Sequence, residues 1–178
     1  MIRSLLDSGA AELRGVHRQV AVEDLGLEPV QHPLPMLIGG NGRRVVGIAG
    51  RHADIFQYTG LTHGPGGAVG PGGFSFDSLI QRRRWLEDAA EERFDSIECS
   101  ALVQRVGLGA GSDELEQEIV EKWSLSSEQL ADCPFALFGS VEQVVDKLER
   151  LRESLGISHY VVRDPVLFAP VVDALRGR

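Results

Sequence analysis

Apolar positions along the chain alternate between short runs and longer helical patterns. Apolar runs predict strands over residues 36–38, 54–59, 97–106 and 157–162. The first is too short for a helix and ends at glycines, and the third has apolar residues at alternate positions from Ile97 to Val103. Apolar residues recur at helical spacing between and after them, which predicts helices over 42–51, 74–93, from Ser112 onward, 140–155 and 165–175. This alternation predicts an α/β fold with a parallel sheet of about four strands and right-handed crossovers.

The helix after Ser140 carries the clearest local signals. Ser140 is followed three residues later by Gln143, which is the spacing of a capping box. Gly156 follows the last apolar position and predicts the end of the helix. In the preceding half of the chain, Ser75 or Asp77 is expected to cap the helix that begins near Phe74.

The first 35 residues give weaker patterns. Apolar positions at helical spacing predict a short amphipathic helix over 2–14, with Gly15 at its end. Weak alternation over 16–22 predicts an extended segment, and three prolines keep 27–35 extended or looped.

Two glycine-rich stretches interrupt these elements. The stretch 37–44, LIGGNGRR, places three glycines between a predicted strand and a predicted helix. It fits a plain tight turn, and it also fits a loop whose backbone N–H groups approach an anion at the helix N-terminus. The stretch 60–73, GLTHGPGGAVGPGG, predicts a flexible glycine-rich loop.

Length, charge and cysteine content limit the classes of function that this chain can have. The chain has 178 residues, enough for a single domain over 1–178, and a net charge of -8, which argues against nucleic-acid binding. The one basic run, Arg82–Arg84, precedes acidic residues and is interpreted as a solvated helix face. Cys99 and Cys133 are expected to be free, buried thiols.

Sequence motifs add further exclusions. The N-terminus lacks the apolar core of a signal peptide and no run has transmembrane length, so we expect a cytoplasmic protein without a membrane partner. The histidines show neither HxH nor HExxH spacing, which disfavours a metal site. Neither a Walker A pattern nor a G-x-S-x-G elbow occurs, and no catalytic residue is assigned.

The order of four motifs resembles a known family. They are P-x-P-x-L-I-G-G-x-G at 33–42, R-x-A-D at 51–54, I-E-x-S-A-L-V-Q-R-V at 97–106, and the closing stretch from Pro134 to Asp164. Together they resemble the bacterial-luciferase-like flavin- or deazaflavin-dependent oxidoreductases, in particular the branch thought to use coenzyme F420. The resemblance covers about residues 15–177 and aligns with the second half of the family's TIM-like barrel.

The resemblance implies a partial barrel and a cofactor site. A full barrel needs about 250 residues, so we expect half of one, with two open sheet edges that invite a homodimer or a partner half-barrel chain. The family's residues beside the reactive ring lie in the half that is not matched. The resemblance implies that FMN or coenzyme F420 is held by its phosphate, with a small organic molecule as substrate. It assigns the phosphate to Gly39, Gly40, Asn41, Gly42, Arg43 and Thr59. The alternative is a non-catalytic, truncated half-barrel.

Overall fold

The computed structural model describes residues 1–27, 29–60, 62–63 and 69–177, and it divides into two compact units. Unit 1 is Met1–Met36 and unit 2 is Leu37–Arg178. The expectation of one domain over 1–178 stays a prediction.

Unit 1 is a short helix followed by a hairpin. Helix α1 spans Ile2–Ser8, and strands β1 (Ala11–Arg14) and β2 (Gln19–Val22) pair antiparallel. The helix predicted over 2–14 is therefore wrong beyond Ser8. Gly9 ends the helix with a φ of 69°, a conformation that favours glycine, and the following residues enter the hairpin. The extended segment predicted over 16–22 includes β2.

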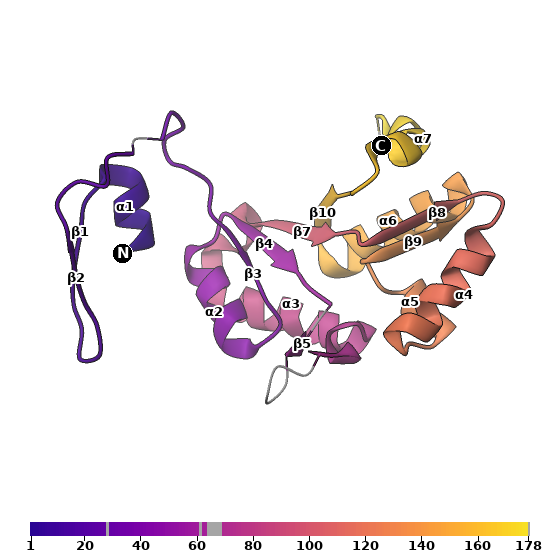
Figure 1. The fold of residues 1–178 in the computed structure, drawn as a ribbon, viewed down its shortest axis with the longest axis horizontal. Helices are drawn as coiled ribbons and strands as arrows, with labels where there is room; N and C mark the ends of the chain where they lie inside the picture. Colours follow the sequence, from indigo (N-terminus) through magenta and orange to yellow (C-terminus); the bar gives the residue numbers. More distant parts are fainter. Residues whose placement is uncertain (28, 61, 64–68, 178) are drawn as a thin grey trace. The chain divides into compact units, whose positions relative to one another are not determined.

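The centre of unit 2 is a four-stranded parallel sheet. Its strands are β3 (Leu37–Gly39), β4 (Ile55–Tyr58), β7 (Glu98–Leu102) and β10 (Ile157–Val161), in the order β10-β7-β4-β3 (Figure 1). All three pairings are parallel. The predicted α/β class, with about four parallel strands and flanking helices, is confirmed.

The strand predicted over 97–106 is in fact two strands in two sheets. After β7 the chain changes partner: the Val103 amide donates to Val161 O and the Gln104 amide to Phe135 O. Strand β8 (Arg105–Leu108) then pairs in parallel with β9 (Ala136–Gly139), a strand that the apolar pattern did not predict. The stretch predicted as one strand therefore contributes to both sheets, and the change falls at Val103 and Gln104.

Helices of unit 2 begin and end close to the predicted positions. They are α2 (Arg43–His52), α3 (Phe76–Ala90), α4 (Ser112–Trp123), α5 (Ser127–Ala131), α6 (Val141–Leu155) and α7 (Pro165–Leu175), with 3-10 turns η2 (Pro71–Gly73) and η3 (Glu91–Ser96). Ser75 caps α3, and the Ser140 capping box of α6 is confirmed. Gly156 ends α6 in the left-handed conformation.

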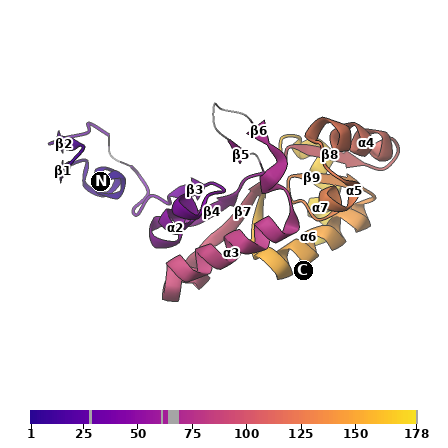
Figure 2. The same cartoon turned by 90° about the horizontal axis from the view of Figure 1, so that it is seen from below.

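Helices cover the face of the sheet that holds the main core. Helices α3 and α6 lie side by side (Figure 2). Beneath them Phe56, Tyr58 and Ala101 are fully buried. The Tyr58 hydroxyl donates to Leu155 O at 3.2 Å, which joins β4 to the end of α6. Cys99 and Cys133 are free and buried, as expected.

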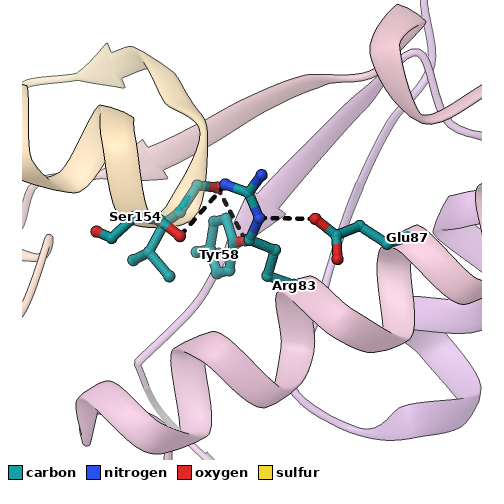
Figure 3. Close-up of polar contacts among 5 residues, drawn as sticks. Tyr58, Arg83, Glu87 and Ser154 are labelled. Atoms are coloured by element: carbon teal, nitrogen blue, oxygen red, sulfur yellow. Dashed lines mark hydrogen bonds and ion pairs between the residues drawn. The ribbon is translucent and has the colours of Figure 1, made fainter.

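Arg83, in the middle of α3, joins this helix to the end of α6. Its Nη1 donates to Ser154 O at 3.2 Å, and its Nε donates to the Glu87 carboxylate at 2.8 Å on the same helix (Figure 3). Its guanidinium also lies 5.6 Å from the centre of the Phe94 ring. This second member of the basic run is therefore partly buried and engaged in packing.

Helices α2 and α3 approach closely at Gly50, which gives a matched pair of substitutions. A Cβ at Gly50 would lie 2.9 Å from Leu86 O and from the Ala90 amide nitrogen, whereas a Cβ at Gly47 would meet only Arg51 Nη1 at 3.5 Å and Ala89 Cβ at 4.0 Å. We expect Gly50→Ala to destabilise the protein by about 1–3 kcal/mol through overpacking. Gly47→Ala should stabilise it by roughly 0.5–1 kcal/mol through helix propensity.

Urea unfolding of both variants against wild type measures these effects. Equal shifts of the two variants in the same direction would contradict the close approach of α2 and α3 at Gly50.

Buried Lys147 fastens the segment that leads into β9. Its Nζ donates to Leu130 O and to Ala136 O, each at 2.8 Å, so α6 holds the end of α5 and the start of β9. Burial lowers the pKa of Lys147 to about 8, with the neighbouring Cys133 acting in the opposite direction.

The lowered pKa of Lys147 predicts a pH-dependent stability. The unfolded chain holds this proton until about pH 10.4, so between pH 8 and that value it binds more protons than the folded chain, and stability rises with pH. From pH 7 to pH 9 the free energy of unfolding of wild type should gain about 1 kcal/mol relative to Lys147→Met. Urea titrations at both pH values measure the difference, and a constant difference would refute the assignment.

Candidate functional site

A pocket of about 700 Å³ opens where β3, β4 and β7 reach their carboxyl ends. In sheets built from strand–helix units, this end of the strands is where ligands bind. The residues that line the pocket come from five parts of the chain: Gly39, Gly40, Asn41 and Gly42; Gln57, Tyr58, Thr59 and Gly60; Phe74; Leu102 and Gln104; and Phe135. The pocket is therefore built from glycine, amide, hydroxyl and aromatic groups.

The residues that the resemblance assigned to a phosphate converge on this pocket. Gly39 ends β3, Gly40 and Asn41 form the turn, and Gly42 is the N-cap of α2. Thr59 follows β4 and lies in the same wall. Arg43 begins α2 directly beyond the turn; it is exposed and is not among the lining residues. Their part in cofactor binding stays a prediction.

Two glycines of the wall are required by close packing. A Cβ at Gly40 would lie 2.6 Å from Val45 Cγ1, and a Cβ at Gly60 would lie 2.7 Å from the Phe74 ring. A Cβ at Gly42, by contrast, meets no atom within 4 Å. The turn therefore presents bare backbone to the pocket and leaves open space at the start of α2, which suits a ligand that hydrogen-bonds to main-chain amides.

The N-terminus of α2 is neither capped by a side chain nor balanced by an acidic residue. Gly42 offers no side chain to the first amides, and the first turn contains Arg43 and Arg44. The first-turn amides of a helix have no acceptor within the helix, and the helix dipole places partial positive charge there. Two arginines add to that charge, so this helix start is suited to an anion.

A buried arginine, Arg82, donates hydrogen bonds to residues of the pocket wall. The sequence interpretation had placed this residue in solvent. The side chain of Arg82, on α3, is 1% exposed. Its Nη1 donates to Asn41 Oδ1 and to Thr59 O, each at 2.5 Å; its Nη2 donates to Gly73 O, and its Nε to Ser78 O at 3.1 Å. Thr59 Oγ1 also donates to Asn41 Oδ1, at 2.6 Å. The Thr59 hydroxyl proton is thus directed at Asn41.

The interpretation of Arg82–Arg84 as a solvated face is wrong for Arg82. It lies on the buried stripe of α3, three residues after Leu79 and four before Leu86, and this spacing is the signal that could have revealed it. Burial lowers the pKa of Arg82 to about 10, so the guanidinium is charged at neutral pH. Its centre lies 5.9 Å from the Tyr58 ring. Within the part of the chain that the structure describes, no carboxylate forms an ion pair with it.

The predicted flexible loop over 60–73 falls partly outside the described residues, at 61 and 64–68. Its described parts are two short strands, β5 (Thr62–His63) and β6 (Val69–Gly70), which pair antiparallel, and the turn η2. The two ends of the segment meet, because a Cβ at Gly73 would lie 2.4 Å from Gly60 O. Flexibility of the loop stays a prediction.

The described residues offer neither a metal site nor a membrane-spanning helix. Those residues contain no group of three or more His, Cys, Asp or Glu side chains placed to hold a metal ion. None of the helices formed by them combines the length and apolar character needed to cross a membrane.

The fold is shared with solved oxidoreductases. An F420-dependent tetrahydromethanopterin reductase from Methanopyrus kandleri matches 98% of this chain and 59% of its own, with TM-score 0.64 and 16% identity. An F420-dependent secondary alcohol dehydrogenase matches 96% and 56%, with TM-score 0.60 and 13% identity. An EDTA monooxygenase from Chelativorans sp. BNC1 matches 93% and 49%, with TM-score 0.59 and 15% identity.

These similarities show the fold. The resemblance to luciferase-like oxidoreductases is confirmed at that level, and the chain spans about half to three fifths of the length of the structures it matches. No protein-family model and no curated protein matches the sequence.

Proposed function

We propose that this chain is the phosphate-binding portion of a luciferase-like oxidoreductase that uses FMN or coenzyme F420 and a small organic substrate. The observation that carries the proposal is the pocket at the strand ends: none of its lining residues is acidic, although the chain has a net charge of -8. Two structural neighbours are F420-dependent enzymes, which supports a cofactor of this type.

The residues of the pocket fit the phosphate end of such a cofactor. The backbone at Gly40 and Gly42 is bare and leads into the uncapped start of α2, so its amides and those of the first helical turn would hold the phosphate oxygens. Arg43 would add a charge at the exposed side. A bound flavin or deazaflavin supplies hydride transfer, with the protein binding and orienting it. Phe74 and Phe135 form an apolar part of the wall.

Titration of the purified chain with three compounds tests this function. We expect FMN or coenzyme F420 to bind, and riboflavin, which lacks the phosphate, to bind at least about tenfold more weakly, a difference of about 1.4 kcal/mol. Isothermal calorimetry measures each affinity. Equal affinities for FMN and riboflavin would contradict the placement of the phosphate, and the absence of binding by all three would overturn the proposal.

A second candidate is a non-catalytic half-barrel that pairs with another chain. Strands β3 and β10 are the two edges of the sheet, and each carries an exposed apolar side chain: Leu37 is 46% and Val161 is 38% exposed. Open edges with apolar residues favour strand pairing with a second copy or a partner half-barrel. Light scattering across a concentration series tests this, and a monomer at all concentrations would count against self-pairing.

We also propose a cytoplasmic location. Free, buried Cys99 and Cys133 support it, because thiols persist in a reducing compartment. Fractionation of cells that produce the protein from its own gene would test the location, and recovery in an oxidising compartment would contradict it.

A further inference from the structure

The charges around the pocket do not balance within the described residues. Arg82 donates its hydrogen bonds to carbonyl, amide and hydroxyl oxygens, all of them neutral. The lining of the pocket has no acidic residue, and the first turn of α2 has two arginines and no acid. This part of an otherwise acidic chain therefore carries a surplus of positive charge.

A buried cation without a counter-ion is costly. The penalty for removing such a charge from water is several kcal/mol, and neutral hydrogen-bond acceptors offset only part of it. Arg82 lies directly behind the wall, because two of its acceptors, Asn41 Oδ1 and Thr59 O, belong to residues that line the pocket. An anion on the open side of Asn41 and Thr59 would offset more of the penalty, since charges interact strongly where water is excluded.

The size of the surplus indicates the kind of anion. A phosphate monoester carries about −1.5 to −2 charges at pH 7, whereas a phosphodiester carries about one. Building on the cofactor proposed above, we propose that Arg82 is the fixed counter-charge of the bound phosphate, acting through Asn41 and Thr59. It makes the pocket selective for a dianionic monoester, as in FMN, over a phosphodiester, as in coenzyme F420.

The test compares two ligands that differ by one charge. FMN and its methyl phosphodiester share the ring and the ribityl chain, so the ratio of their dissociation constants isolates the second charge. We expect wild type to prefer FMN by at least about tenfold. Arg82→Lys, which keeps the charge, should retain most of this preference, whereas Arg82→Gln should reduce it to less than about threefold. Arg84→Gln, at the exposed neighbour on α3, is the control for net charge and should leave it unchanged.

A folded Arg82→Gln chain that keeps the preference would overturn the inference, as would a wild type that binds both ligands equally or binds coenzyme F420 more tightly than FMN. If Arg82→Gln does not fold, the same ratio of dissociation constants is measured on Asn41→Asp. Its carboxylate occupies the position that accepts from Arg82 and neutralises the guanidinium within the fold. The preference should then fall below about threefold, and an unchanged ratio refutes the role of Arg82. If none of the ligands binds to wild type, the result would instead contradict the proposed function, which is binding of the cofactor.

Discussion

Replacing Arg82 by methionine is expected to lower the free energy of unfolding by about 2–4 kcal/mol. The substitution removes the Arg82 donors to Thr59 O and Gly73 O, whereas Asn41 Oδ1 keeps the Thr59 hydroxyl as a donor. A buried acceptor left without a donor costs about 1–3 kcal/mol. Part of this loss is recovered because a buried charge no longer has to be desolvated. For a chain of this length, the melting temperature should fall by roughly 5–15 °C.

Arg84→Met is the matched control for Arg82→Met. It makes the same chemical change two residues away on the exposed face of α3, and we expect it to shift stability by less than about 0.5 kcal/mol. Chemical unfolding followed by circular dichroism measures both variants. Similar small effects at the two positions would show that the buried guanidinium does not hold the wall together.

Replacing Gly42 by aspartate is expected to stabilise the protein and weaken cofactor binding at the same time. A Cβ at this N-cap position meets no neighbouring atom, so the side chain fits and its carboxylate can accept from the first amides of α2. The cap and the helix dipole should add about 0.3–1 kcal/mol of stability. The same carboxylate occupies the place proposed for the phosphate, so affinity for FMN or coenzyme F420 should fall about 10- to 100-fold.

A gain in stability together with a loss of affinity in Gly42→Asp would indicate that the turn is a ligand site. A gain in stability alone would indicate that it is only a structural turn. Gly42→Ser supplies a neutral cap and is the control: it should also stabilise the fold while reducing affinity by less than about fivefold. Thermal melts and calorimetric titrations of wild type and the two variants provide both readouts. Unchanged affinity in the aspartate variant would mean that the phosphate does not lie at the start of α2.

Much of the fold could be predicted because its signals are local. Apolar runs bounded by glycine marked β3, β4 and β10, and the capping box at Ser140 marked the start of α6. Strand β9 was missed although 135–138 is an apolar run that ends at Gly139, so the same local signal could have revealed it. Likewise, the hairpin strand β1 was predicted as helix because residues 2–14 carry helical spacing, and Gly9 rather than Gly15 ends the helix.

Some residues of the candidate site could also be predicted from the sequence, and others could not. The glycine turn and Thr59 could be placed from the order of the motifs, because each follows a strand of a parallel sheet and such strands end at one edge. The basic run suggested that Arg82 is solvated, and only its helical spacing from Leu79 and Leu86 indicated burial. The contacts of Arg82 could not be predicted from a local pattern, because its acceptors Asn41 Oδ1 and Thr59 O lie 41 and 23 residues earlier in the chain.

The contact between Gly60 and Gly73 has a consequence for engineering this protein. The two residues close the base of the segment between them, and the cost of closing a loop grows only slowly with its length. A side chain at position 73 would collide with the Gly60 carbonyl oxygen beside the pocket wall, so an engineered version of this protein has to keep glycine there.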